Sequence, residues 1–141
     1  MVEVEILGVS DGPKHPVVLL RHEERVLPIV VGMPEAHAIQ MGLMDEKYGR
    51  PMTHDLVCNL LAGLGAQLQS VTIYKLENET FFAHLNLEQS EPNGELTQVL
   101  KIDSRPSDGI AVAVRVGCPV YVADKVMESA AQDVAILSPE D

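Results

Sequence analysis

The sequence predicts an α+β fold, in which a single curved or barrel-like, mainly antiparallel sheet has helices packed on its outside. Segments with the alternation of half-buried strands come in runs of three, and each run is followed by segments with helical spacing. Parallel doubly wound folds instead alternate strands with helices, so they fit this order less well. The two runs are similar, which indicates a duplicated unit of three strands and two helices.

The first unit begins with three expected strands at residues 2–9, 17–20 and 26–31. Two helices follow them. The first helix is expected to begin at Glu35, and the second can be capped by the hydroxyl of Thr53. The second helix has an apolar face formed by Leu56, Val57, Leu60, Leu61 and Leu64.

The second unit repeats this order, with expected strands at residues 67–76, 80–88 and 96–103. Pro106 is expected to begin the next helix. The backbone N–H groups in the first turn of a helix have no partner within the helix, so proline, which has no N–H, loses no hydrogen bond there. A last helix follows Asp124. The match between the units is closest at residues 30–36 and 102–108, where each has a strand, a short break, a proline and an acidic helix start.

The composition indicates one folded domain at residues 1–131 and a short acidic tail at 132–141. The chain has 141 residues, 46% of them hydrophobic, which is enough for a single core. Cys58 and Cys118 lie far apart inside apolar stretches, which indicates buried free thiols and a reducing compartment. Their spacing matches no metal-binding motif. No apolar run reaches the roughly 20 residues of a membrane span, so we expect a cytoplasmic protein without a membrane partner.

The net charge of −11 limits the ways in which this chain could bind nucleic acid. An acidic surface repels phosphates and lacks the basic stripe that gives sequence-independent binding its affinity. Any contact with nucleic acid must therefore be local or assisted by a metal ion.

The junction at residues 102–108 is the most informative segment, because polar side chains crowd the point where a strand gives way to a helix. Asp103 should point away from the Ile102 side of the strand, and Asp108 falls in the first helical turn. Capping by Ser104 and structural salt bridges would explain these residues, and on spacing alone this is the favoured interpretation. Alternatively, Arg105 and backbone donors could hold a phosphate while Asp103 and Asp108 hold a divalent cation.

A second polar segment, residues 50–55, precedes the second helix. His54 could act as a general acid or base, or could simply hydrogen-bond to a nearby carbonyl. Arg50 could contact a phosphate, or could anchor the loop by pairing with Asp55. His54 and Asp55 are adjacent and cannot share a helix face, so one metal bound by both is not expected.

Four segments together resemble the bifunctional nuclease domain family: residues 3–8, 27–39, 50–56 and 102–113. Residues 50–56 are similar to its Arg-Pro-Leu-Thr-His-Asp-Leu motif, with Met52 in place of leucine. Residues 103–109 are similar to its Asp-Ala-Arg-Pro-Ser-Asp-Ala motif, with Ser104 and Gly109 in place of alanines. Glu35 matches the acidic residue after Gly32, although residues 33–34 are Met-Pro where Pro-Phe is usual. His37 stands at a position that varies within the family, so we do not count it among the candidate catalytic residues.

The resemblance implies a cytoplasmic, often self-associated domain with nuclease activity on DNA and RNA, and we expect a homodimer or another homo-oligomer. The motif positions supply the candidate residues for such a site. Candidate catalytic residues are His54, Asp55, Asp103 and Asp108; candidate substrate-binding residues are Arg50, Arg105 and Ser107. Asp103 and Asp108 are also the candidate ligands of Mg²⁺ or Mn²⁺.

An alternative hypothesis is a non-catalytic interaction or regulatory domain, in which the polar junctions tie the two halves or two subunits together. In that case Arg105 pairs with Asp103, Asp55 or Glu35 in a buried network. Solvent exposure distinguishes the two hypotheses, because an open cleft with unpaired carboxylates would favour a binding site.

Overall fold

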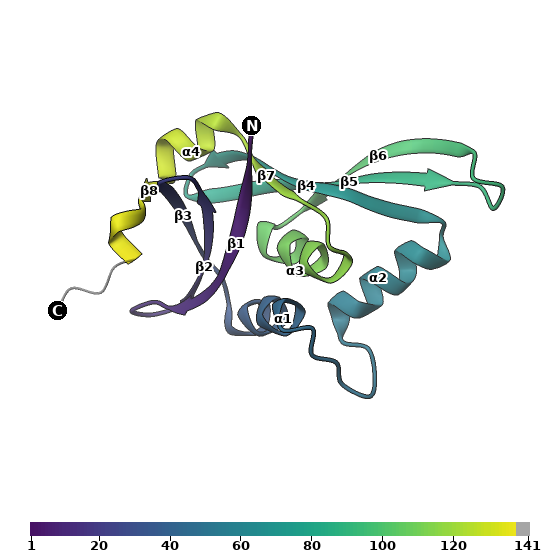
Figure 1. Cartoon of the computed structure of the whole chain (residues 1–141), viewed down its shortest axis with the longest axis horizontal. Coiled ribbons are helices and arrows are strands. Elements are labelled where there is room, and N and C mark those ends of the chain that lie inside the picture. The colour runs from purple at the N-terminus through teal and green to yellow at the C-terminus, as the bar shows by residue number, and fades with distance from the viewer. Residues whose placement is uncertain (138–141) are drawn as a thin grey trace.

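The computed structural model describes residues 1–137, which form one eight-stranded sheet and four α-helices (Figure 1). The α+β prediction is therefore confirmed. In chain order the elements are β1 (Val2–Asp11), β2 (Pro16–His22), β3 (Arg25–Val30), α1 (Met33–Leu43), α2 (Thr53–Gly63), β4 (Ala66–Glu77), β5 (Thr80–Ser90), β6 (Leu96–Ser104), α3 (Pro106–Val116), β7 (Val120–Val122), α4 (Asp124–Ala130), β8 (Gln132–Asp133) and a 3₁₀ turn (Val134–Leu137).

The sheet is mainly antiparallel, with the strand order β6-β5-β4-β7-β1-β2-β3-β8. It contains two three-stranded antiparallel units, β1 to β3 and β4 to β6, as the two runs of strands predict. β7 joins these units, because it pairs antiparallel with β1 and parallel with β4. The sheet is open, with β6 and β8 at its edges, so it is not a barrel. The shared order of elements in the two halves does not by itself establish a duplication.

Helix α3 is the centre of the core, and the sheet bends around it (Figure 1). Its residues from Gly109 to Ala113 are all buried, and they are small or aliphatic, so β4, β5, α1 and α2 can pack closely against it. The helix begins at Pro106 as predicted. Its helical neighbours α1 and α2 lie on the same side of the sheet, inside the bend and not outside it.

The ends of several elements differ from the sequence predictions. Helix α1 begins at Met33, two residues before Glu35, because Pro34 fits the first turn. Thr53 is the first residue of α2 and does not cap it; the carboxylate of Asp55 accepts the N–H of Met52 instead. The hydroxyl of Ser104 donates to the carbonyl of Arg105, so it does not cap α3.

Two short strands were not predicted. β7 has only three residues, and its Val120 and Val122 are buried, a run too short to show a period. β8 begins the expected tail and pairs with β3, so residues 132–133 belong to the sheet. The end of that tail, residues 138–141, lies outside the described residues.

The apolar face predicted for α2 is only partly used for packing. Val57 and Leu61 are half-buried against the core, whereas Leu56, Leu60 and Leu64 are 51%, 55% and 63% exposed. The five residues therefore lie on an apolar face of the helix, but only two of them pack against the core. None of the helices within residues 1–137 is both long enough and apolar enough to cross a membrane.

Candidate functional site

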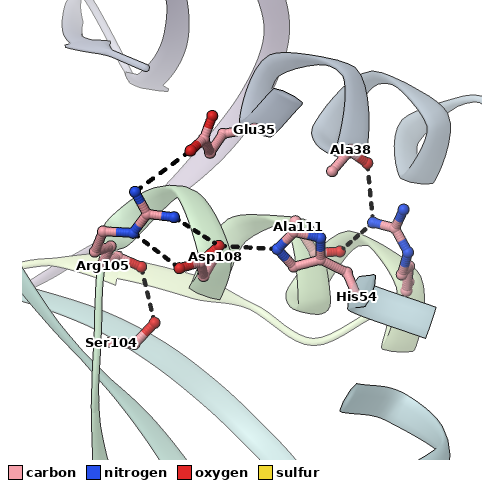
Figure 2. A network of polar contacts seen from close by, with 8 residues as sticks. Glu35, Ala38, His54, Ser104, Arg105, Asp108 and Ala111 are labelled. Atoms are coloured by element: carbon pink, nitrogen blue, oxygen red, sulfur yellow. Dashed lines mark hydrogen bonds and ion pairs between the residues drawn. The ribbon is translucent and has the colours of Figure 1, made fainter. Parts of the chain in front are cut away.

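The first turns of three helices converge on one group of polar side chains (Figure 2). Glu35 comes from α1, His54 from α2 and Asp108 from α3, and Arg105 is the residue that precedes α3. We call these four residues the helix-start cluster. The two carboxylates suit this place because the N-terminal ends of helices carry partial positive charge.

Arg105 is the cation of the cluster and lies between its two carboxylates (Figure 2). Its Nε donates to Asp108 Oδ2 at 3.0 Å and its Nη2 to Asp108 Oδ1 at 3.4 Å. Its Nη1 lies 3.4 Å from Glu35 Oε1. The side chain of Arg105 is nevertheless 65% exposed, so solvent or a ligand can reach the guanidinium.

His54 lies on the other side of Asp108, with its Nε2 2.9 Å from Asp108 Oδ1. An ionised carboxylate only accepts hydrogen bonds, so Nε2 carries the proton of this contact. The imidazole is 13% exposed and Asp108 is 38% exposed. The result is a histidine whose orientation and tautomer are set by a carboxylate at the edge of a cavity.

Glu35 has one oxygen without a hydrogen-bond partner among the described residues. This atom, Oε2, is buried against Gly32, and a Cβ at Gly32 would stand 2.5 Å from it. The absence of a side chain at Gly32 therefore allows the carboxylate to fold back over the start of α1. A buried carboxylate oxygen without a donor is costly, so this position favours a donor from a ligand or water.

The cluster borders a cavity of about 240 Å³ between the helix starts, lined also by Pro34, His37, Ala38, Met41, Met52, Thr53 and Arg115. His37 is part of the wall but belongs to a separate pair, since its Nε2 lies 3.2 Å from the hydroxyl of Tyr48. The cavity is small, and most of its wall is apolar.

Arg115, in the last turn of α3, was missed by the sequence analysis although it holds the three helices together. Its Nε donates to Asp55 Oδ1 at 2.9 Å, and its Nη1 donates to the carbonyls of Ala38 and Ala111 at 2.9 and 2.7 Å. The side chain is only 10% exposed. A single arginine within an apolar helical run is the one signal that could have identified it.

The other candidate residues are spread over different surroundings. Asp55 pairs with Arg115 and not with Arg50. Arg50 is exposed and lines a separate cavity of about 400 Å³ together with Asp55 and Arg115. Ser107 is buried in the first turn of α3, 7% exposed, at a cavity that Glu35 and Arg105 also line.

Asp103 is not brought together with Asp108. The hydroxyl of Ser104 faces α3, where it lies 3.6 Å from the Cβ position of Gly109. Successive side chains of a strand point to opposite faces, so the exposed Asp103 lies on the other face of the sheet, across from His84 on β5.

This arrangement does not fit a divalent cation held by Asp103 and Asp108. Both oxygens of Asp108 already bond to Arg105 and His54, and Asp103 lies on the far face. Within residues 1–137, no three His, Cys, Asp or Glu side chains come close enough to hold a metal ion. We therefore derive no chemical step through a cation from this geometry.

Two carboxylates of the site have lowered pKa values. The N–H of Met52 and then the guanidinium of Arg115 lower the pKa of Asp55. Partial burial acts to raise the pKa of Asp108, but the hydrogen bonds from His54 and Arg105 outweigh it, so this pKa is also lowered. Both side chains therefore stabilise the fold in their ionised forms.

This linkage predicts acid sensitivity. The stabilising contribution of Asp55 and Asp108 is present above the pKa of an unfolded aspartate, about 3.9, and is lost as the pH falls through their lower folded values. Urea denaturation between pH 6 and pH 3 should show a free energy of unfolding that decreases below about pH 4. The decrease should be shallower in Asp55→Asn and in Asp108→Asn; equal slopes in wild type and both variants would contradict this account.

Comparison with known proteins agrees with the motifs described above. The bifunctional nuclease domain model matches residues 17–135. An uncharacterized protein of Mycobacterium tuberculosis is 39% identical over 134 residues, which cover 92% of this chain and 76% of that protein. "Bifunctional nuclease 1" of Arabidopsis thaliana is 28% identical over 117 residues, 81% of this chain and 35% of the plant protein. "Bifunctional nuclease 2" of Oryza sativa subsp. japonica is similar at 28% over 118 residues, 82% of this chain and 35% of that protein.

The similarity to the plant proteins covers only about a third of their length, whereas the family match covers most of this chain. The matched region includes all four residues of the helix-start cluster. The chain belongs to the bifunctional nuclease domain family.

Proposed function

We propose that the chain hydrolyses phosphodiester bonds of DNA and RNA without sequence preference, at the helix-start cluster. One observation carries the proposal: a histidine oriented by a carboxylate stands beside an exposed arginine at the edge of a cavity. The names of the plant relatives support the same reaction class.

In this proposal His54 transfers the proton. Asp108 accepts the Nε2 proton, which leaves Nδ1 of a neutral imidazole as the basic nitrogen. Nδ1 would take a proton from the attacking water and return it to the leaving oxygen. General acid and base catalysis of this kind contributes roughly 100-fold to 10,000-fold to a rate.

Arg105 is proposed to bind the phosphate. A guanidinium can bond to two phosphate oxygens at once, and this one is exposed. The guanidinium lies 3.4 Å from Glu35 and 3.0 Å from the nearer oxygen of Asp108. It is therefore released from Glu35 more easily than from Asp108. The starts of three helices add backbone dipoles that favour an anion here, and they offset the acidic surface locally.

The test is a cleavage assay on single-stranded and duplex DNA and RNA with highly purified protein. Asp108→Asn should lower the rate about 100-fold or more, because a neutral amide can present its NH₂ to His54 in place of an oxygen, so it no longer fixes the tautomer with the proton on Nε2, and it carries no charge to stabilise the imidazolium. Glu5→Gln, on the exposed side of β1, removes the same charge away from the cluster and should change nothing. Cleavage that is equal in wild type and Asp108→Asn would remove the proposal.

The requirement for Mg²⁺ or Mn²⁺ remains a prediction of the sequence, and the same assay can examine it. Asp103→Asn should lower the rate if Asp103 binds a catalytic cation. It should leave the rate unchanged if the helix-start cluster acts alone, as the separation of Asp103 from Asp108 favours. Parallel reactions with Mg²⁺, Mn²⁺ and a chelator show which ion, if any, is needed.

A second candidate function is a non-catalytic interaction or regulatory domain. It is favoured by the mutual pairing of the cluster, since both oxygens of Asp108 bond to protein groups. In that case Asp108→Asn destabilises the fold without changing any cleavage. Measuring thermal unfolding and cleavage on the same samples therefore separates the two functions.

A further inference from the structure

A second cavity lies beside the one at the helix-start cluster. Its volume is about 400 Å³, and we call it the loop cavity, because residues 45–51 of the loop that joins α1 to α2 form much of its wall (Figure 1). Met41 and Arg115 line both cavities, so the two share a wall. A ligand that is longer than one phosphate group and is bound at the cluster can therefore extend into the loop cavity.

Tyr48 gives the loop cavity an exposed aromatic ring. The residue is 54% exposed. Its hydroxyl lies 3.2 Å from Nε2 of His37, which lines the cavity at the cluster, so the tyrosine lies where the two cavities meet. Nucleobases stack on exposed aromatic side chains in proteins that bind single strands, and every base has a face that can stack. An aromatic ring at this place therefore favours a nucleotide as ligand. Tyr48 precedes the motif at residues 50–56, so the family resemblance gives it no role.

Arg115 has one donor group that no protein atom uses. Its Nε and Nη1 bond to Asp55 and to two helix carbonyls, but no hydrogen bond within residues 1–137 involves its Nη2. Among the buried and half-buried side chains of the same residues, only Glu35 Oε2 is both closed to solvent and without a partner, so Nη2 is open to solvent on the side of the cavities that Arg115 lines. The rest of this side chain is buried. A guanidinium nitrogen without an acceptor in such a place favours an anionic or carbonyl oxygen from a ligand.

Lys47 and Arg50 bring two more cations to the loop cavity. Both are exposed, and neither forms an ion pair in the part of the chain that the structure describes. The cavity is also lined by three acidic side chains: Asp45, Glu46 and Asp55. The three cations and the three carboxylates cancel, whereas the chain as a whole carries a net charge of −11. A phosphate therefore meets less repulsion here than the overall charge suggests, and two of the cations have no protein partner to leave.

We propose that the loop cavity binds the nucleotide next to the scissile phosphate, with its base stacked on Tyr48 and its own phosphate held by Lys47 and Arg50. This inference rests on the proposed function, because it places the scissile phosphate at the helix-start cluster. Nη2 of Arg115 supplies a further donor on the shared wall. Asn59 lines the same cavity with an exposed amide, which can donate to a base edge or accept from it. Stacking accepts every base, which agrees with cleavage without sequence preference.

Equilibrium binding of a fluorescein-labelled thymidine decamer to the full chain, followed by fluorescence anisotropy, tests the proposal. Tyr48→Leu keeps an apolar side chain but loses the aromatic face, so it should raise the Kd about tenfold. Tyr48→Phe loses only the hydroxyl and its contact with His37, so its Kd should stay near the wild-type value. The two variants thus separate stacking on the ring from a structural role of the hydroxyl.

The phosphate contact is tested through the salt dependence of the same Kd. Lys47→Met should weaken binding and reduce the slope of log Kd against log salt concentration by about 0.7, the value for one phosphate contact with a single strand. Lys125→Met removes the same charge from the exposed first turn of α4, away from the loop cavity, and should change neither quantity. An unchanged slope in Lys47→Met would remove its phosphate contact from the proposal.

Binding needs no turnover, so it can be judged apart from cleavage. A gel shows whether the decamer stays intact, and the His54→Gln background serves if the wild type degrades it during the titration. A wild type that binds the decamer but cleaves nothing would end the proposed function, while the Kd values would still decide the role of Tyr48. In an active protein, Tyr48→Leu should raise KM for the decamer and leave kcat nearly unchanged.

Three results would overturn the proposal. The first is an equal Kd for wild type and Tyr48→Leu, the second is an equal loss in Tyr48→Phe and Tyr48→Leu, and the third is a wild type that does not bind the decamer. Circular dichroism shows that each variant is folded.

Discussion

His54→Gln is expected to lower the cleavage rate of single-stranded DNA and RNA by about 100-fold or more, with little change in the fold. Glutamine keeps a polar side chain that can hydrogen-bond to Asp108, but it cannot exchange a proton near neutral pH. The loss should appear mainly in kcat, because the phosphate-binding group, Arg105, is unchanged. Initial rates over a range of substrate concentrations measure both kcat and KM.

His37→Gln is the matched control, because His37 lines the same cavity but pairs with Tyr48 and not with a carboxylate. It should retain nearly all activity. Equal losses in the two variants would mean that the pairing with Asp108 confers no special role on His54. Full activity in His54→Gln would exclude it as the proton-transfer group.

Arg115→Met is expected to cause the largest loss of stability of any substitution proposed here, about 2–3 kcal/mol. Methionine fills much of the same space, but it leaves the carboxylate of Asp55 and the carbonyls of Ala38 and Ala111 without their donor. Because Asp55 is 36% exposed, water offsets part of this loss. The melting temperature should fall by roughly 10 °C for a chain of this size.

Urea denaturation measures the free energy directly. Arg115→Lys should recover only part of it, because an ammonium group cannot reproduce the planar set of donors that reaches two helices at once. Arg21→Met, near the end of β2 where the Arg21 side chain bonds to the carbonyl of Glu23, should cost no more than about 0.5 kcal/mol, because this contact is local and exposed. An Arg115→Met variant as stable as Arg21→Met would contradict the role assigned to Arg115.

The features that depend on neighbouring residues were predictable from the sequence. The alternation of apolar and polar residues indicates the long strands. Pro106 indicates the start of α3, because the preference of proline for a helix start depends only on the local backbone. Of the two acidic partners of Arg105, Asp108 is only three residues away, whereas Glu35, one of the three partners that the sequence suggested, is 70 positions away. The motifs at residues 50–56 and 103–109 therefore identified three members of the helix-start cluster, His54, Arg105 and Asp108, as candidate site residues.

The features that depend on distant contacts were not predictable. Arg115 bonds to groups 60 and 77 positions away, and no local pattern gives those partners. The apolar spacing of α2 indicates a face but not what covers it, so its exposed leucines could not be foreseen. Asp103 and Asp108 are close in sequence, yet the alternation of β6 turns one of them to the far face, which separates residues that the motif groups together.

The position of β7 has a consequence for how the protein is made. β7 is the only strand that joins β1 to β4 within the described residues, and it follows both three-stranded units in the chain. While the nascent polypeptide is still attached to the ribosome, the β1–β3 and β4–β6 units can each form, but they cannot be sealed together until Val120–Val122 have emerged. Biogenesis of the domain thus waits for residues that follow both units, with long-range pairing as a late step.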